Sequence, residues 1–412
     1  KERLRAWRVR RCPPPHFAAA LRPSPRARGV ARALGYAAMG QGASASHAYD
    51  ARRPLLLLWG PAAAEEVALL SSFLQSEWNL QLWDPEADEP ENEQERAQLE
   101  QLLQRVTVLV TRRVEPRVLQ KMTQLKLLQM PLSSHEWLDW QSVPPQCMVC
   151  NSHCMSIPVA EYVMAAVLSW EVRLHEMDAK FRKQRVLKDL ALVTKHGEVH
   201  GKTLGIVGYG HVGEQVALRA SAFGMRIVAL VRTPRGSVPP PLEWLGTGED
   251  ALVKLLEVSD YVLVSLPMSR QTKELIGARH LAKMKPSAVL INVGAGAAIH
   301  EAALYDALKR KRIGGAVLDS WWEAADAAQE SEEPRMPSQF AFHKLDNCII
   351  SQNSAGWTEE HLERRWKEIA ANADSVARNE LHRVQCQLRP PASFFSTSAM
   401  AATNGATRGP QR

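Results

Sequence analysis

The sequence predicts an α/β protein with two doubly wound parallel-sheet domains. Short apolar runs alternate with amphipathic helical segments from Arg53 onward. These runs are continuous rather than alternating in polarity, which is typical of strands buried on both faces. Helices between such strands form the crossovers of a parallel sheet. A second series of the same kind begins at Thr203, and therefore indicates two domains within the 412 residues.

The first domain is expected to span 54–156 and to be completed by a returning segment, 357–385. Its continuous apolar runs are bounded by turn residues, and the segments between them have helical periodicity. The expected strands lie at 54–61, 80–85, 106–111 and 125–131, and the expected helices at 62–76, 91–106 and 114–122.

The second domain is expected to span 157–356. It opens with one long helix at 157–186, with Pro158 in its first turn, where proline is well tolerated. A second βαβ series then runs from Thr203 to about Ile350. A final helix is expected at 358–381, with Thr358 as its N-cap.

The net charge of +7 is unevenly distributed. Residues 1–53 hold 12 Lys and Arg against Glu2 and Asp50, and the other 359 residues have a small excess of acids. The body of the chain therefore lacks the basic face that a nucleic-acid-binding protein needs. No apolar run of about 18 residues is present, so no membrane span is expected. The three cysteines of "CMVCNSHC" lack a second Cys/His pair, which argues for buried free thiols and against a metal site.

Both ends of the chain are expected to be disordered, because 1–53 is rich in arginine and 386–412 has little apolar periodicity. Residues 1–38 resemble a transit peptide for an organelle. Alternatively, Met39 opens "MGQGAS", which fits a myristoylation signal if the protein starts there. The sequence leaves these interpretations open, and with them a cytoplasmic or an organellar location.

The segment "TLGIVGYGHVGEQVALRASAFG" contains G-x-G-x-x-G as Gly208, Gly210 and Gly213. The motif follows an apolar strand and opens a helix, which is the context of a dinucleotide-binding Rossmann-like domain. The first glycine permits a tight turn, the second lets the backbone approach the pyrophosphate, and the third allows close helix–sheet packing. The intervening residues Tyr209, His211 and Val212 belong to the same predicted cofactor loop.

The end of the following strand predicts the choice of dinucleotide. NAD-selective sites place a carboxylate there to bind the ribose 2′-hydroxyl. This chain has Val231, Arg232 and Thr233 instead, with Arg235 just beyond them. Because the guanidinium group suits a 2′-phosphate, we favour NADP(H), with NAD(H) as the alternative.

Several longer segments extend this signature. They are "VSDYVLVSLPMSRQTKELIGARHLAKMKPSAVLINVGAG", "EAALYDALKRKRIGGAVLD", "NSHCMSIPVAEYVMAAVL" and "FHKLDNCIISQNSAGWTEEHLERRW". With them the chain resembles the D-2-hydroxyacid dehydrogenases, most densely over 156–381. The resemblance implies two Rossmann-like or flavodoxin-like domains and hydride transfer between a nicotinamide and a small 2-keto or 2-hydroxy acid. It also implies a homodimer and cofactor contacts from four loop residues, Leu266, Pro267, Val293 and Asp319.

The chain departs from this family at its catalytic positions. Where the family pattern N-x-x-R-G has arginine, this chain has Ala295, and where T-P-H has histidine, it has Asn353, which also lies among the expected cofactor contacts. The catalytic glutamate is displaced, with Glu333 as a possible counterpart. The glycine-bearing loop that faces the substrate aligns with Leu132, Ser133 and Ser134.

Two hypotheses follow from these substitutions. The first is a slow oxidoreductase that uses NADP(H) on a small 2-keto acid, because a positioned general acid and an electrostatic clamp contribute large factors to such rates. The second is an inactive nucleotide-binding protein that acts as a redox sensor or scaffold. A purely structural role with a dead nucleotide site gives no reason to retain the three glycines.

Overall fold

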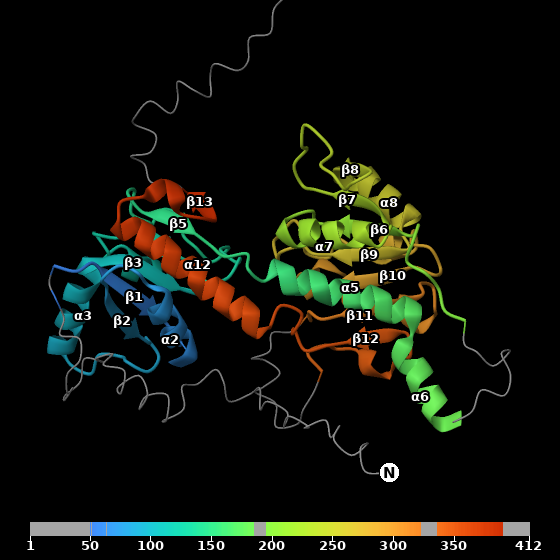
Figure 1. The fold of residues 1–412 in the computed structure, drawn as a ribbon, viewed down its shortest axis with the longest axis horizontal. Coiled ribbons are helices and arrows are strands. Elements are labelled where there is room, and N and C mark those ends of the chain that lie inside the picture. Colours follow the sequence, from blue (N-terminus) through green and yellow to red (C-terminus); the bar gives the residue numbers. More distant parts are fainter. Residues whose placement is uncertain (1–49, 51, 63, 185–194, 323–335, 390–412) are drawn as a thin grey trace, which may run out of the picture. The chain divides into compact units, whose positions relative to one another are not determined.

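The computed structural model describes residues 50, 52–62, 64–184, 195–322 and 336–389 (Figure 1). The chain divides into two compact units, a first unit of 1–151 with 366–412 and a second unit of 152–365. Each unit is an α/β structure with helices on both faces of one sheet (Figure 1). The chain returns from the second unit to the first at residue 366, inside helix α12 (Glu359–Ala377). The sequence pattern had placed this boundary after residue 356.

The first unit contains a six-stranded sheet in the order β13-β5-β4-β3-β1-β2. Five strands are parallel, and β13 pairs antiparallel with β5. The expectation of a disordered tail from residue 386 is therefore wrong for the first few residues, because β13 completes the sheet edge beside β5. The strands are β1 (Leu55–Trp59), β2 (Asn79–Trp83), β3 (Val106–Thr111), β4 (Leu127–Gln129), β5 (Met148–Cys150) and β13 (Gln387–Arg389).

Both faces of this sheet are buried, as the continuous apolar runs predicted. In β1, Leu55 and Leu57 pack into the core on one face, while Leu56 and Leu58 pack into the core on the other. Successive side chains of a strand point to opposite faces, so the four consecutive leucines of β1 supply both cores. The helices of this unit are α2 (Ala64–Phe73), α3 (Glu93–Arg105), α4 (Pro116–Leu119) and the later part of α12.

Helix α12 is fastened to the first unit by a buried carboxylate. Asp374 accepts hydrogen bonds from the backbone N–H groups of Gln75 and Ser76, at 2.7 and 3.0 Å, and from the Trp78 indole at 3.1 Å. At the other end of α12, Thr358 Oγ accepts from the His361 N–H at 3.1 Å, the capping contact that the sequence predicted. The helix ends at Ala377 rather than at residue 381.

The second unit contains a seven-stranded sheet in the order β12-β11-β10-β9-β6-β7-β8, with every pair parallel. Helices α5 and α7 contribute to the core on one face, and α8 to α10 contribute to the core on the other. The strands are β6 (Thr203–Val207), β7 (Arg226–Leu230), β8 (Trp244–Gly246), β9 (Tyr261–Val264), β10 (Val289–Asn292), β11 (Gly315–Leu318) and β12 (Cys348–Ile350). The helices are α5 (Ser156–Val172), α6 (Leu174–Gln184), α7 (His211–Ala222), α8 (Gly248–Val258), α9 (Ala278–Leu281) and α10 (Glu301–Lys309).

The single long helix expected at 157–186 is wrong, because the chain breaks between α5 and α6. Arg173 has a φ of 54°, in the left-handed region, while its N–H still bonds to Ser169 O. A left-handed residue ends a helix and redirects the chain, a role that glycine or asparagine usually fills. No glycine or proline marks this position, so the residue pattern alone did not reveal the break. The last two residues of the expected helix, 185 and 186, lie outside the described residues.

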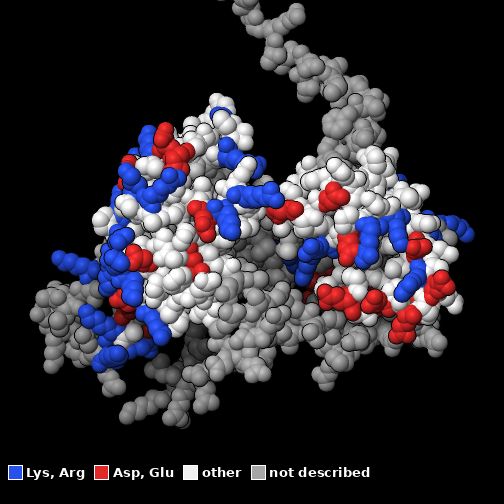
Figure 2. All heavy atoms as spheres, turned by 180° about the vertical axis from the view of Figure 1, so that it is seen from behind, with Lys and Arg blue, Asp and Glu red and all other residues white. Residues whose placement is uncertain are grey.

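The described surface carries both signs of charge. Figure 2 shows basic and acidic side chains lying among each other on the face that it presents. Among the described helices, none is long and apolar enough to cross a membrane.

The buried His361 predicts how stability depends on pH. Burial, together with the Arg365 and Arg364 guanidiniums, lowers the pKa of His361 to about 4. In the unfolded chain this imidazole titrates near its ordinary value of about 6.5, so the unfolded state binds the extra proton between these two values. Folding stability is therefore expected to fall by about 2 kcal/mol between pH 7 and pH 5 from this residue.

Urea unfolding of wild type and His361→Gln across this pH range measures the contribution. The variant is expected to show a shallower pH slope, whereas His382→Gln, at an exposed site, retains the wild-type slope. Equal slopes for His361→Gln and wild type would contradict the assignment.

Candidate functional site

The predicted cofactor and catalytic residues of the second unit gather at the carboxyl ends of its strands. The glycine loop follows β6, and Leu266 and Pro267 follow β9. Val293 and Ala295 follow β10, Asp319 follows β11, and Asn353 lies beyond β12. Strand β6 lies between β7 and β9, where the strand order reverses. In doubly wound sheets, ligands bind beyond the carboxyl ends at such a switch point.

The three glycines of the loop have different surroundings. Gly208 has a φ of 102°, and a Cβ there would lie 3.0 Å from the carbonyl oxygen of Ser265. A Cβ on Gly213 would lie 2.8 Å from the carbonyl oxygen of Gly208. A residue larger than glycine at position 213 would therefore prevent helix α7 from packing this close to the loop. No heavy atom lies within 4 Å of the corresponding position at Gly210. The backbone at Gly210 is therefore open to an approaching group.

Helix α7 begins at His211, directly behind this open backbone. The first N–H groups of a helix lack intrahelical partners, and they favour a phosphate group. The His211 ring stacks on His153 at 3.8 Å between centroids. Val212 is half-buried and Tyr209 is buried beneath the loop. The loop therefore fits a dinucleotide pyrophosphate at Gly210 and the α7 N-terminus.

The two arginines beyond β7 lie in different environments. Arg235 donates to the carbonyl oxygen of Tyr209 at 3.0 Å, approaches the Glu214 carboxylate at 3.5 Å and lies 5.4 Å from the Tyr209 ring centroid. It thus braces the glycine loop. Arg232 and Thr233 are exposed, and within the described part of the chain Arg232 makes no ion pair. Arg232 is the guanidinium that is free to meet a ligand beside the loop.

The loops after β9 and β10 pack closely together. The Ala295 N–H bonds to Leu266 O at 2.8 Å. A Cβ on Gly294 would lie 2.5 Å from the Leu266 nitrogen, so this approach requires glycine. Ala295 itself is half-buried with extended backbone angles. Its methyl group offers neither charge nor hydrogen bond at the position where the family pattern has arginine.

Asp319 organises the loop that carries Asn353. The carboxylate is 3% exposed and accepts from the N–H groups of Ser354 and Ala355, at 2.8 and 3.0 Å. The Ser351 hydroxyl donates to it at 2.5 Å, and Tyr162 OH lies 2.6 Å from the same hydroxyl. The buried charge is thus balanced by dipoles within the second unit. Sequence reasoning did not single out Tyr162 or Ser351, because their role depends on contacts between distant elements.

Asn353 is held in the left-handed region, with a φ of 55°. Its N–H bonds to the carbonyl oxygen of Asp319 at 2.8 Å, and its side-chain oxygen accepts from Ser320 at 3.4 Å. The side chain is exposed. An amide in this place can donate or accept a hydrogen bond but exchanges no proton at neutral pH.

The predicted substrate loop lies in the first unit, after β4. Leu132 is half-buried, whereas Ser133 and Ser134 are exposed. The Asn151 amide donates to Ser133 O at 3.0 Å, and Ser134 Oγ donates to the Glu136 carboxylate at 2.9 Å. The loop is therefore anchored from behind and presents its serines outward.

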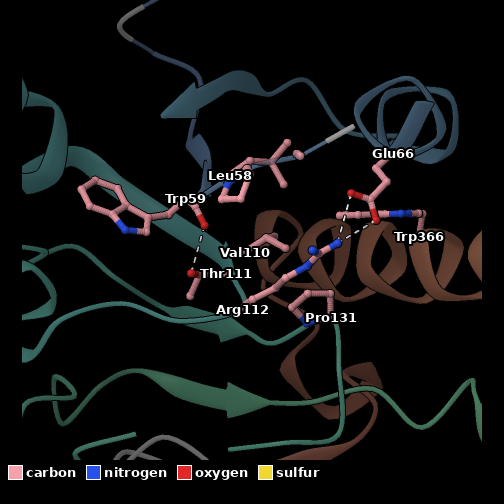
Figure 3. Close-up of a pocket in the computed structure, with 11 residues that line it drawn as sticks. Leu58, Trp59, Glu66, Val110, Thr111, Arg112, Pro131 and Trp366 are labelled. Carbon is pink, nitrogen blue, oxygen red and sulfur yellow. Dashed lines mark hydrogen bonds and ion pairs between the residues drawn. The ribbon is translucent and has the colours of Figure 1, made fainter. Parts of the chain in front are cut away.

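Beside this loop is a small pocket of about 20 Å³ at the carboxyl ends of β1 and β3 (Figure 3). The Arg112 guanidinium points to the buried Glu66 carboxylate there, at 3.3 and 3.4 Å, with the Trp366 ring alongside (Figure 3). The volume is enough for one water molecule. The residue pattern does not reveal this ion pair, because Glu66 lies in α2 and Arg112 follows β3, with β2 and α3 between them along the chain.

Glu333, the possible counterpart of the catalytic glutamate, lies outside the described residues. Cys147 and Cys150 are buried thiols, and Cys154 is half-buried. Among the described residues, no group of three or more His, Cys, Asp or Glu side chains is arranged to hold a metal ion.

The surroundings of the glycines predict separable effects of substitution. We expect Gly210→Ala to leave the unfolding temperature of the free protein unchanged, because the added methyl enters open space. It should weaken dinucleotide binding by about tenfold or more, because backbone approach to the pyrophosphate is blocked. Gly213→Ala, the matched control, should lower the free protein's unfolding temperature, because its methyl meets the Gly208 carbonyl. Thermal unfolding with and without NADPH distinguishes the two, and equal behaviour of the variants would contradict the assignment.

The comparisons with known proteins agree with this arrangement. A model of the NAD-binding domain of D-isomer-specific 2-hydroxyacid dehydrogenases matches residues 164–353. The glyoxylate reductase of Thermococcus litoralis is 29% identical over 283 residues, which cover 67% of this chain and 81% of that protein.

Two solved structures extend the likeness across both units. An acyclic imino acid reductase in complex with NADPH and D-Arg has a TM-score of 0.59 at 22% identity, covering 82% of this chain and 100% of that one. The D-lactate dehydrogenase of Aquifex aeolicus, complexed with NAD and lactic acid, has a TM-score of 0.61 at 20% identity, covering 81% of this chain and 98% of that one. At these identities the structures show the common fold alone. The family-model match spans the glycine loop, and it shows that residues 164–353 are similar to the NAD-binding domain of the D-isomer-specific 2-hydroxyacid dehydrogenases.

Proposed function

We propose that this protein binds NADP(H) and transfers a hydride, slowly, between it and a small 2-keto or 2-hydroxy acid. The observation that carries the proposal is the open glycine loop at the switch point of the second unit's sheet, with the exposed Arg232 beyond the neighbouring strand β7. The likeness of residues 164–353 to the NAD-binding domain of this family supports a nicotinamide cofactor and chemistry of this class.

The preference for NADP(H) is argued from the end of β7. Val231 donates its N–H to Gly246 O and carries no charge, so no carboxylate is present there to repel a 2′-phosphate. Arg232 and Thr233 are exposed and available for hydrogen bonds to that phosphate. Arg235 contributes indirectly by bracing Tyr209. One of the two solved structures holds NADPH and the other holds NAD, so they favour neither dinucleotide. The preference for NADP(H) therefore depends on Arg232.

The slow rate follows from Ala295 and Asn353. A nicotinamide supplies the hydride when it is bound, and the protein must polarise the carbonyl and deliver a proton. Asn353 can donate a hydrogen bond to the reacting oxygen but cannot protonate it, and Ala295 cannot bind a carboxylate. Each missing group is worth a factor of about 10²–10³ or more in rate. The factors need not multiply, because such groups act as a unit.

The alternative is a nucleotide-binding protein without turnover that acts as a redox sensor or scaffold. The observation that favours it is the simultaneous replacement of both catalytic groups beside an intact glycine loop. In this reading, Asp319 and its hydrogen bonds maintain the loop for binding alone.

Substrate contact and assembly complete the proposal. We assign the acid's carboxylate to the outward-facing Ser133 and Ser134 of the first unit. A homodimer accords with exposed apolar side chains on α6, where Leu174 is 64% and Phe181 is 53% exposed, because a second subunit would cover them.

Titration of the full chain with NADPH and, in parallel, NADH tests the cofactor assignment. We expect NADPH to bind more tightly, and Arg232→Ala to weaken NADPH by about tenfold or more while leaving NADH unchanged. Arg312→Ala removes an exposed charge elsewhere in the second unit and should leave both affinities intact. Equal affinities for the two dinucleotides in the wild type would contradict the preference.

The double variant Ala295→Arg with Asn353→His tests the catalytic argument. Histidine is among the residues that tolerate the left-handed conformation of position 353, and position 295 has ordinary backbone angles. We expect reduction of glyoxylate or hydroxypyruvate with NADPH to rise by about 10²-fold or more.

The matched control is Asn379→His, the same replacement at another left-handed position, in the first unit, and it should leave the rate unchanged. If NADPH binds and the double variant shows no gain, the substrate pocket no longer accepts these acids. The binding-protein alternative then holds.

A further inference from the structure

The second unit contains another pocket, at the end of the sheet opposite the glycine loop. Its volume is about 350 Å³. Lys202 lies just before β6, Asp260 and Tyr261 at the start of β9, and Ser287 just before β10. These are the amino ends of parallel strands. A five-residue strand such as β6 spans roughly 16 Å, so the pocket and the glycine loop are separate sites.

The floor of the pocket is a hydrogen-bonded network. One oxygen of the Glu171 carboxylate accepts from the Tyr261 hydroxyl at 2.5 Å and from Lys202 Nζ at 2.6 Å. A Cβ on Gly197 would lie 1.5 Å from the other carboxylate oxygen, so glycine is required for Glu171 to lie there. Burial, the hydrogen bond to Glu171 and its charge raise the pKa of Tyr261, which keeps this hydroxyl a proton donor.

The carboxylates of the pocket are already neutralised from within the second unit. Glu171 is paired with Lys202, as described above. Asp260 is bound by Lys285 Nζ at 2.7 Å and by the Thr203 N–H at 2.8 Å. Neither carboxylate is therefore available to attract a cation into the pocket.

The rim carries positive charge that is not balanced in this way. Arg173, the left-handed residue that breaks α5 from α6, lines the pocket with a side chain 55% exposed, and its nearest carboxylate, Glu176, is 4.0 Å away. Lys195 also lines the pocket, is exposed, and makes no ion pair within the described part of the chain. Two cations at the mouth of a polar cavity favour an anion.

We propose that this pocket is a second binding site, for a small organic dianion of the dicarboxylate or phosphate-monoester class. Arg173 and Lys195 bind the anionic groups, and Tyr261 and Lys202 define the polar floor. The volume suits a molecule of this size, since small-molecule sites begin at about 300 Å³. The site would make the break at Arg173 functional, because a continuous helix would direct this guanidinium elsewhere.

Calorimetric titration of the full chain, saturated with NADPH and at low ionic strength, tests the proposal. Succinate and inorganic phosphate are the two probes, and together they distinguish a carboxylate-selective from a phosphate-selective site. We expect at least one of them to bind, and its affinity to fall about tenfold in Arg173→Asn and in Lys195→Gln. Asparagine tolerates a left-handed backbone, so the first variant keeps the fold.

Lys311→Asn is the matched control. Lys311 is also a basic left-handed residue beyond a helix end in the second unit, with a φ of 53°, and it lies outside the pocket. Its replacement should leave the anion affinity unchanged. The proposal is overturned if neither probe binds the wild type, or if Arg173→Asn and Lys195→Gln bind as wild type does.

Two further results would also overturn it. One is an equal loss of affinity in Lys311→Asn, which would indicate nonspecific charge. The other is anion binding to the cofactor-free protein that is absent from the NADPH-saturated protein, which would place the anion at the glycine loop. If NADPH itself fails to bind, the proposed function fails, and the three variants still test the pocket by titration without cofactor.

Discussion

A parallel sheet must be covered on both faces, and this constraint explains the arrangement of the chain. In the first unit, the core shared by Leu56, Leu58 and α2 is completed by α12, from the other end of the chain. Trp366 and Ile369 bury apolar surface there, which contributes most of the free energy of such packing. Asp374 then sets the position of the helix through directional hydrogen bonds to the turn after α2. The first unit is therefore discontinuous in sequence because its core needs this helix.

In the second unit, one buried carboxylate has a similar role. An isolated ionised group in a protein interior is costly unless hydrogen bonds compensate it. Asp319 is compensated by Ser351, Ser354 and Ala355, so its own stability requires the loop after β12 to fold against it. The same contacts fix Asn353 in its left-handed conformation. Site geometry is thus preserved by interactions independent of the catalytic side chains, and Ala295 and Asn353 can differ from the family pattern while the scaffold persists.

The two ends of the second unit's sheet differ in their chemistry. At the carboxyl ends, open backbone at Gly210 and the first turn of α7 present N–H groups. At the amino ends, the Glu171 network closes a polar floor beneath the cationic Arg173 and Lys195. Both arrangements favour anions, one through backbone dipoles and the other through side-chain charge. The sheet between them is an apolar core that both sites share.

The sequence by itself determined the two parallel-sheet units, the glycine loop and the chemical identity of positions 295 and 353. These depend on local periodicity and on motifs in which the residues are neighbours along the chain. Tertiary structure decided the break at Arg173, the pairing of β13 with β5, the bracing role of Arg235 and the Tyr162–Ser351–Asp319 contacts. Each of these depends on partners far apart in sequence, and hydrogen bonds depend on distances and directions that only the packed chain defines. For that reason the fold was predictable from the residues, whereas the electrostatic environment of each site was not.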